Sequence, residues 1–346
     1  MEEYLRGLRQ DELSALKLRE MYRRYGYIPY RMRQFEEYEL YLQNRNFLRS
    51  DRILTFTDTD GSLRAMKPDI TLSIVRSYSG DPLYKVSYSE TVIRPDDSGF
   101  REIRQTGLEC IGEVDILRQS EVVLLAWQSL SLSGQECILD LSHLGFTREL
   151  VDSLVPEDMR RKVMKAIGAK NTGLLKKYGA ELPEEDVQLL MKAAELYGRA
   201  EDMLGVMQGM IRTPAAEEAY RELADTVKAV KSVVPEAVRN IDLSMIDDLN
   251  YYNGLIFRGM LKGIPQVILS GGRYDNLLKR MNKPGRAIGF AVYLDLLERS
   301  EMAENEPVKT VSYTENSDPA EILKQLKDLY DEGFTVQAVC DGGVQG

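Results

Sequence analysis

A stretch in the first third of the chain carries polar side chains at a spacing suited to ligand binding. Residues 101–112 read Arg-Glu-Ile-Arg-Gln-Thr-Gly-Leu-Glu-Cys-Ile-Gly. Successive side chains of a β-strand point to opposite faces. In a strand, one face of this stretch would therefore carry the polar and small residues Arg101, Gln105, Gly107 and Glu109.

Two environments could accept such a face. Buried charges need partners, so a row of Arg, Gln and Glu is costly to pack inside a protein unless a polar ligand lies against it. Gly107 would then leave room for close approach of that ligand. The alternative is an edge strand whose polar face contacts solvent, and the spacing alone favours neither.

Composition narrows the chemistry. The net charge of −10 argues against nucleic-acid binding, which usually needs a basic patch. The single histidine, His143, rules out multi-histidine metal sites and is better explained as a structural residue after a strand than as part of a catalytic dyad. Three widely spaced cysteines, Cys110, Cys137 and Cys340, suit a reducing cytoplasm and do not have metal-binding spacing. We therefore expect a cytoplasmic protein with no metal and no cofactor.

No run of apolar residues approaches the eighteen or so that a membrane-spanning helix needs. The first residues, Met-Glu-Glu, are acidic and lack the basic and apolar stretches of a signal peptide. We expect no membrane association.

Short β-rich runs and helical patterns share the region up to residue 300. Helical patterns cover 1–25 and 118–131. The β-rich runs, separated by turn residues, are 53–57, 84–88, 240–243, 251–261 and 265–269. This texture predicts an α+β fold, with a largely antiparallel sheet flanked by helices.

The middle of the chain, residues 147–235, is almost purely helical in pattern. Apolar residues recur at helical spacing from 183 onward, and Gly198 is a plausible helix stop. Because strands of similar character flank this block, we predict a helical insertion at 147–235 in a core formed by 1–146 and 236–300. The apolar stripes are better explained by internal packing than by a partner-binding face.

Residues 308–346 have the pattern of a small α/β unit. A helix is expected to begin at Asp318, which is followed by a proline, and to end at Gly333. The flanking runs 310–314 and 335–340 would be parallel strands joined right-handedly through this helix. The unit is too small to be stable alone, so it must dock or be incomplete.

Several segments together resemble a known family. Residues 101–112 resemble motif 2 of class II aminoacyl-tRNA synthetases, in their histidyl branch. Other segments resemble further family motifs in the same order: 66–71 (Met-Lys-Pro-Asp-Ile-Thr), 249–252 (Leu-Asn-Tyr-Tyr), 270–275 (Ser-Gly-Gly-Arg-Tyr-Asp) and 287–291 (Ala-Ile-Gly-Phe-Ala). The resemblance covers roughly residues 10–300 and implies a class II synthetase-like core.

The resemblance implies that an amino-acid pocket is retained. Its residues would be Asp69, Thr71, Gln105, Glu109, Tyr251 and Tyr252. The acidic and amide groups could hold an ammonium group by charge-assisted hydrogen bonds of about 1.5–3 kcal/mol each. The others could add hydroxyls and aromatic walls. Adjacent strand residues face opposite sides, so we expect at least one of the two tyrosines to reach the pocket.

The nucleotide side is depleted of positive charge. Arg94 matches the motif 2 arginine, and Arg94 with Arg101 forms the expected remnant of a nucleotide site. The histidyl-specific arginine of the family aligns with Asp247, and the motif 3 arginine aligns with Leu296. Loss of one such group typically costs on the order of a hundred- to a thousand-fold in rate. Two losses predict a chain that does not adenylate amino acids.

These features resemble the regulatory subunits of short-form ATP phosphoribosyltransferase, which are paralogues of histidyl-tRNA synthetase. The resemblance implies a non-catalytic subunit that activates the small catalytic subunit of that transferase and mediates feedback inhibition by histidine in histidine biosynthesis. It implies a homodimer within a hetero-oligomer, although Arg33 aligns with the proline of motif 1 and puts the dimer geometry in question. tRNA binding is not expected, because 308–346 resembles only the start of an anticodon-binding domain.

Two alternatives remain open. The chain could be a divergent ligase that activates an amino acid with other cations, such as Arg101, Arg273 or Arg286. It could also be an amino-acid-sensing module that recruits some other protein.

Overall fold

The computed structural model describes residues 8–48, 52–246, 251–297, 309–314, 317–334 and 336–340. They belong to two compact units, Met1–Ser300 and Glu301–Gly346. Of the sequence expectations, the one for Asp247 lies outside the described residues, as do Leu249 and Asn250 of the family-like segment 249–252.

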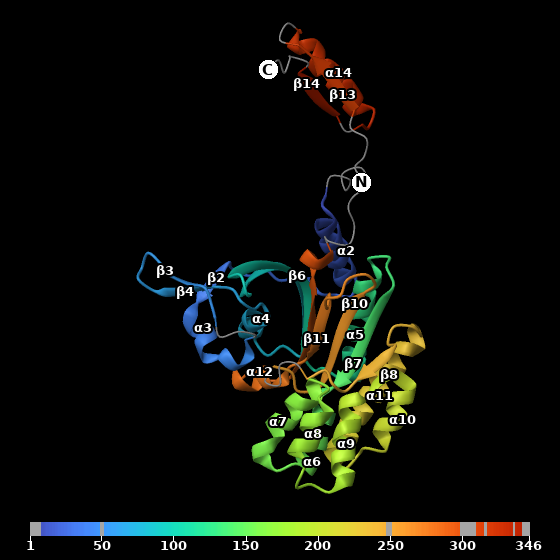
Figure 1. Ribbon diagram of the computed structural model, residues 1–346. Coiled ribbons are helices and arrows are strands. Elements are labelled where there is room, and N and C mark those ends of the chain that lie inside the picture. Colours follow the sequence, from blue (N-terminus) through green and yellow to red (C-terminus); the bar gives the residue numbers. More distant parts are fainter. Residues whose placement is uncertain are drawn as a thin grey trace. The chain divides into compact units, whose positions relative to one another are not determined.

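The first unit is built on a nine-stranded sheet with the order β1-β5-β6-β12-β11-β10-β7-β9-β8 (Figure 1). Its pairs are antiparallel except for β1 with β5 and β7 with β9. The strands are β1 (Ile28–Pro29), β5 (Leu83–Pro95), β6 (Phe100–Gly112), β7 (Cys137–His143), β8 (Tyr197–Arg199), β9 (Asn240–Asp242), β10 (Leu255–Leu261), β11 (Leu269–Arg273) and β12 (Arg286–Tyr293). The predicted α+β fold with a largely antiparallel sheet is confirmed.

The sheet separates two hydrophobic cores, and β6 contributes to both. Leu108 and Cys110 lie in the core that includes helices α2 (Gln10–Arg24) and α5 (Ile116–Ser131). Ile103 and Ile111 lie in the other core. The alternation predicted for this strand is therefore present, and Gln105 and Glu109 share the face of the second core.

The second core is covered by short elements. A small antiparallel sheet with the order β2-β4-β3 packs there with three helices. These elements are β2 (Phe35–Glu37), α3 (Tyr38–Gln43), β3 (Thr55–Thr57), β4 (Leu63–Met66), α4 (Thr71–Ser77) and α12 (Asp275–Arg280). A 3₁₀ turn (Arg45–Phe47) follows α3, and α13 (Leu294–Leu297) follows β12.

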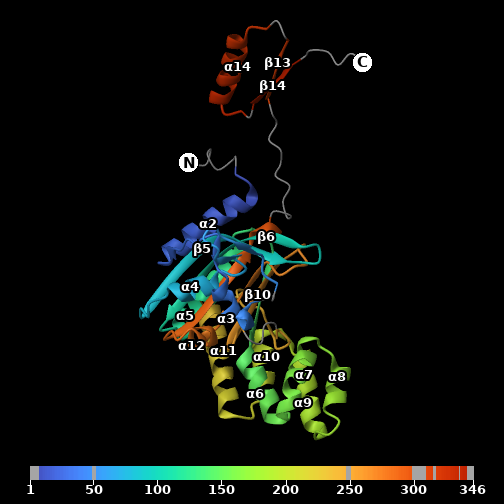
Figure 2. The same ribbon diagram turned by 90° about the vertical axis from the view of Figure 1, so that its left-hand side faces the viewer.

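The block between β7 and β9 gathers helices at one end of the sheet (Figure 2). They are α6 (Leu144–Leu154), α7 (Glu157–Gly168), α8 (Thr172–Tyr178), α9 (Glu184–Glu195), α10 (Ala200–Gln208) and α11 (Pro214–Val233). The longest, α11, packs against both α5 and α6. Its cap, Thr213, accepts a hydrogen bond from the Ala216 amide at 3.0 Å.

Several boundaries differ from the sequence expectation, among them those of α9, β10 and β11. Helix α9 ends at Glu195, and Gly198 lies in β8, which pairs with β9, because the sheet edge offers this segment long-range backbone partners. Strand β10 begins at Leu255, so Tyr251 and Tyr252 precede it. Strand β11 covers Leu269–Arg273 rather than 265–269.

The second unit contains β13 (Lys309–Tyr313), α14 (Pro319–Asp331) and β14 (Val336–Cys340). The two strands pair in parallel, as expected. Asp318 begins the helix by accepting the Ala320 amide at 3.0 Å. Gly333 follows the helix with φ of +88°, a conformation that favours glycine.

Candidate functional site

The predicted site residues converge on one pocket on the second-core side of the main sheet. It has about 460 Å³ of free space, counting its open mouth. It is lined by Asp69, Ile70, Thr71, Tyr88, Arg94, Gln105, Glu109, Tyr251, Tyr252, Ser270, Tyr274, Gly289, Phe290, Ala291 and Tyr293. All six residues proposed to bind an amino acid are present, together with Arg94. Their roles as ligand-binding residues stay predictions.

A buried carboxyl group lies at the centre of this pocket. Glu109 is 2% exposed and accepts hydrogen bonds from Thr71 Oγ1 at 2.8 Å and Tyr274 Oη at 2.5 Å. Burial raises the pKa of Glu109 to about 8, although these two hydrogen bonds oppose the rise, and the charge of Asp69 adds to it. Glu109 is therefore mostly protonated at pH 7 in the empty pocket. A cationic ligand group beside it would favour the carboxylate.

The raised pKa predicts how stability depends on pH. Folded Glu109 keeps its proton up to about pH 8, whereas the unfolded chain loses it near 4.5. Its contribution is thus fully present below pH 4.5 and is lost as pH rises toward 8. Relative to Glu109→Gln, the parent should lose about 1.4 kcal/mol of unfolding free energy per pH unit between pH 5 and 8. Urea unfolding across this range measures the difference, and a constant difference would contradict the assignment.

Two glycines make room for the buried groups. A Cβ at Gly289 would lie 1.7 Å from Glu109 Oε2 and 2.4 Å from the Leu108 carbonyl oxygen. A Cβ at Gly107 would lie 2.6 Å from the hydroxyl of Tyr88, the residue paired with it on β5. The sequence expectation that Gly107 leaves room for a ligand is therefore wrong, because the chain itself fills this space.

A carboxylate and a guanidinium lie together in the same pocket. Asp69 Oδ1 accepts the Leu72 amide at 2.9 Å, while Oδ2 lies 3.8 Å from an Nη of Arg94. Arg94 Nε donates to the Pro68 carbonyl at 2.8 Å, which holds its side chain in place. Buried Gln105 adds an amide nitrogen that has no hydrogen-bond partner among the described residues. This set could bind both charged groups of an amino acid.

Aromatic side chains form much of the pocket wall. Tyr251 and Tyr252 both line it, with ring centroids 4.8 Å apart. The argument from strand alternation does not apply to them, because the two residues precede β10. The Tyr251 ring also lies 5.8 Å from that of Tyr274.

Sequence reasoning missed Tyr88, Tyr274 and Tyr293 as pocket residues. Tyr274 had a usable signal, since it lies within a family-like segment directly after a strand. Tyr88 and Tyr293 could be found only from strand register, which places them opposite Gly107 and Gln105 respectively.

Positive charge around the pocket is sparse. Arg94 is the one basic residue among the described residues that line it. Arg101 does not line it: its side chain is 50% exposed and lies 3.7 Å from Asp96 in the β5–β6 hairpin. Leu296 in α13 packs against both hydrophobic cores. Of the cations considered for a divergent ligase, Arg273 and Arg286 also lie outside the lining set.

The single histidine lies elsewhere. His143 ends β7 and caps α6, with Nδ1 accepting the Phe146 amide at 3.2 Å, which agrees with a structural role. Across the described part of the chain, no group of three or more His, Cys, Asp or Glu side chains could hold a metal ion. None of the helices described there has the length and apolar character needed to cross a bilayer.

Comparisons with known proteins identify relatives of this chain and solved structures with a similar fold. A regulatory subunit of ATP phosphoribosyltransferase from Desulfitobacterium hafniense is 28% identical over 300 residues, covering 83% of this chain and 77% of the relative. A solved ATP phosphoribosyltransferase regulatory subunit/histidyl-tRNA synthetase from Bacillus halodurans C superimposes with a TM-score of 0.81 at 23% identity, covering 97% of this chain and 90% of that one.

A chain of the ATP phosphoribosyl transferase (HisG:HisZ) complex from Thermotoga maritima has the same fold, with a TM-score of 0.67 at 20% identity. The match covers 82% of this chain and 97% of that one. A family model described as histidyl-tRNA synthetase matches residues 6–297, which is most of the chain. The protein therefore belongs to the histidyl-tRNA synthetase family.

Proposed function

We propose that this chain is a non-catalytic regulatory subunit of ATP phosphoribosyltransferase. It would activate the catalytic subunit and mediate feedback inhibition by histidine in histidine biosynthesis, acting in the cytoplasm as a homodimer within a hetero-oligomer. The proposal rests on one observation: the described residues that line the pocket include two buried carboxyl groups and a single arginine. Relatives named as regulatory subunits of this transferase support it.

The pocket suits an amino acid better than a nucleotide. A triphosphate needs several cationic groups as its charge develops. Here the lining set offers Arg94, already held beside Asp69, while Glu109 adds a group that becomes negative when ionised. Leu296, at the position of the family's motif 3 arginine, contributes no charge.

An amino acid would use these groups without leaving any charge unpaired. Its ammonium would lie against Asp69, and its carboxylate would face Arg94 and could accept a hydrogen bond from the Gln105 amide nitrogen. Glu109 and the tyrosine rings would contact the side chain of the bound amino acid. In histidine, an imidazole N–H could donate to the Glu109 carboxylate. Coupling between this pocket and the catalytic partner is reciprocal, so substrates of the partner should weaken histidine binding.

The proposed organisation follows the sequence boundaries. Residues 1–146 and 236–300 would form the synthetase-like core, 147–235 an insertion, and 308–346 a small α/β unit. The insertion consists mainly of helices, and its one short strand, β8, pairs with β9 at the edge of the main sheet.

Activation and inhibition of the transferase test the function. The short-form catalytic subunit, inactive alone, should co-purify with this chain, gain activity and become inhibited by histidine. Asp69→Asn should weaken inhibition by about ten- to a hundred-fold while leaving activation, since a charged hydrogen bond is worth about 1.5–3 kcal/mol. Glu184→Gln, at an exposed position in α9, is the matched control and should behave as the parent.

The alternatives give different results in the same assays. Amino-acid-dependent exchange of pyrophosphate into ATP by the chain alone would establish a ligase. Histidine binding without any association with the catalytic subunit would indicate a sensor for another protein. Either outcome would overturn the proposed function.

A further inference from the structure

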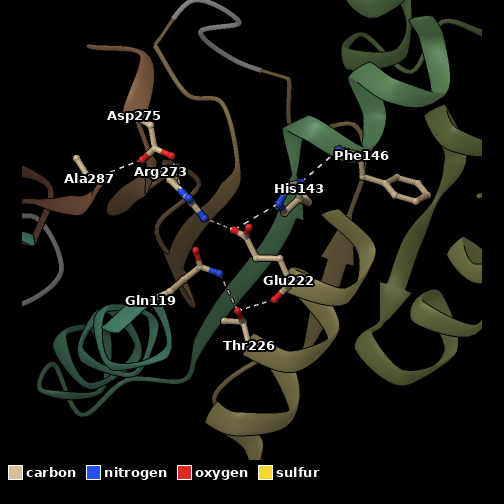
Figure 3. A network of polar contacts seen from close by, with 8 residues as sticks. All are labelled: Gln119, His143, Phe146, Glu222, Thr226, Arg273, Asp275 and Ala287. Atoms are coloured by element: carbon tan, nitrogen blue, oxygen red, sulfur yellow. Dashed lines mark hydrogen bonds and ion pairs between the residues drawn. The ribbon is translucent and has the colours of Figure 1, made fainter. Parts of the chain in front are cut away.

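A buried polar network joins the helical block to the segment beside the pocket (Figure 3). Arg273, at the end of β11, donates from Nη1 to Glu222 Oε1 of α11 at 2.9 Å and from Nε to Asp275 Oδ2 at 2.8 Å. The three side chains are only 10–19% exposed. One buried guanidinium thus holds carboxylates from two separate elements.

Glu222 is strongly favoured in its ionised form. Burial alone would raise its pKa, but His143 and Arg273 together outweigh burial and lower the pKa to about 2. His143 Nε2 lies 3.5 Å from Oε1, longer than a good hydrogen bond, so Arg273 is the closer partner. Removing Glu222 would leave Arg273 with Asp275 as its remaining carboxylate partner in the network.

The Arg273 contacts are linked to the pocket through Tyr274 and Asp275. Tyr274 follows Arg273 in the chain, and its hydroxyl donates to Glu109. Asp275 Oδ1 accepts the Ala287 amide at 2.9 Å, on the strand that carries Gly289 against the Glu109 carboxyl group. Both neighbours of Tyr274 in the chain, Arg273 and Asp275, are thus held by hydrogen bonds, and the position of the Tyr274 ring depends on them.

A second pocket segment depends on the same arginine. The Asn253 amide, directly after the Tyr251–Tyr252 pair, donates to the Arg273 carbonyl at 3.0 Å. At Gly254 a Cβ would lie 3.0 Å from Arg273 Cδ, so backbone and arginine stem are in close contact. Three of the pocket tyrosines thus belong to segments that Arg273 supports.

We propose that Glu222 is a positioning residue for the pocket, which acts by holding Arg273 and thereby the Tyr274 hydroxyl on Glu109. Ligand affinity and the packing of α11 on the core are then coupled. Movement of the helical block would change the pocket, and a ligand that engages Glu109 would stabilise the docked position of α11. This coupling rests on the proposed function for the identity of the ligand, histidine, and on the contacts above for its route.

The test compares two variants one helical turn apart on α11. Glu222→Gln removes the charge that holds Arg273 with little change of shape. Thr226→Val is the matched control: Thr226 is buried and accepts from Gln119 Nε2 of α5 at 2.8 Å. Its hydroxyl also donates to the Glu222 backbone carbonyl at 2.7 Å, but the Glu222 carboxylate that holds Arg273 is not part of that bond (Figure 3). Both changes remove a polar contact between α11 and the core.

Calorimetry with L-histidine on the full-length chain, from pH 6.5 to 8.5, gives the first readout. Glu222→Gln should weaken binding by about tenfold and displace the pH at which affinity levels off. Thr226→Val should lower the melting temperature yet keep the parent affinity and pH profile. Equal affinity and pH profile for parent and Glu222→Gln, or equal losses in both variants, would overturn the proposal.

A second readout needs no ligand and separates this proposal from the proposed function. Infrared difference spectra report the protonated carboxyl of Glu109, identified by its loss in Glu109→Gln. Its titration midpoint should move in Glu222→Gln and stay in place in Thr226→Val. The groups facing it are Asp69, Thr71, Tyr88, Tyr251 and Tyr274. If histidine does not bind, the proposed function is wrong, but the titration of Glu109 still tests the coupling between Glu222 and the pocket. A titration midpoint that does not move in Glu222→Gln would refute this coupling.

Discussion

An alanine at position 289 should reduce histidine binding by at least about a hundred-fold and should release the transferase from feedback inhibition. The added methyl would overlap the Glu109 carboxyl group at 1.7 Å and the Leu108 carbonyl at 2.4 Å. The Glu109 side chain can rotate away from the added methyl group. The Leu108 carbonyl oxygen cannot move aside, because it belongs to the backbone of β6, which pairs with β12. Displacing Glu109 also breaks the hydrogen bonds that it accepts from Tyr274 and Thr71, each worth about 0.5–1.5 kcal/mol while Glu109 is neutral.

Gly205→Ala supplies the control for this change. Gly205 lies inside α10, where a Cβ would meet nothing within 4 Å. Alanine there should stabilise the helix by up to about 1 kcal/mol and leave binding intact. Calorimetry measures binding, and circular dichroism checks that Gly289→Ala is folded. If that variant unfolds, Glu109→Gln tests the same loss of binding. Parent-like affinity in a folded Gly289→Ala chain would contradict the placement of Glu109 in the site.

Histidine binding should release a proton and strengthen with rising pH. Burial holds the pKa of Glu109 at about 8 in the empty pocket, so most molecules at pH 7 carry the proton. An imidazole N–H donated to Glu109 favours the carboxylate and lowers that pKa on binding. Below pH 8 the affinity for histidine is reduced, because binding must first remove the proton from Glu109. Above pH 8 the affinity levels off. Between pH 6.5 and 8 the gain should be roughly fifteen-fold.

Calorimetry at pH 7 in buffers of different ionisation enthalpy counts the released proton directly. The parent should release close to one proton per histidine bound. Asp69→Asn should bind more weakly but still release it, because the proton comes from Glu109. Proton uptake, or an affinity that is constant over this range, would show that Glu109 stays neutral in the complex.

Both predictions depend on one physical feature, the buried carboxyl group of Glu109. Gly107 and Gly289 make this burial possible, because the absence of a side chain allows strand backbones and aromatic rings to approach closely. A small change at either glycine therefore acts on ligand binding without touching the ligand. In contrast, the exposed β5–β6 hairpin around Arg101 and Asp96 has little packing to disturb.

Local patterns were sufficient for the helical block at 147–235, for several strands and for the face of the central strand. The alternation of residues 101–112 correctly separated Leu108 and Cys110 from Gln105 and Glu109, because strand geometry has a strict period of two. The capping residue Asp318 likewise marked the start of α14. The order of the family-like segments indicated the histidyl-tRNA synthetase family, which the family match over residues 6–297 confirms.

Tertiary structure alone decided the contacts that give the pocket its chemistry. Tyr274 and Glu109 are 165 residues apart, and no local spacing encodes that hydrogen bond. The filling of the Gly107 space by Tyr88 follows from strand register, and β8 forms where a helix was expected to continue because β9 supplies backbone partners. The Glu222–Arg273 pair joins elements 51 residues apart. Sequence patterns report periodicity within one element, whereas burial and pKa values depend on which elements meet.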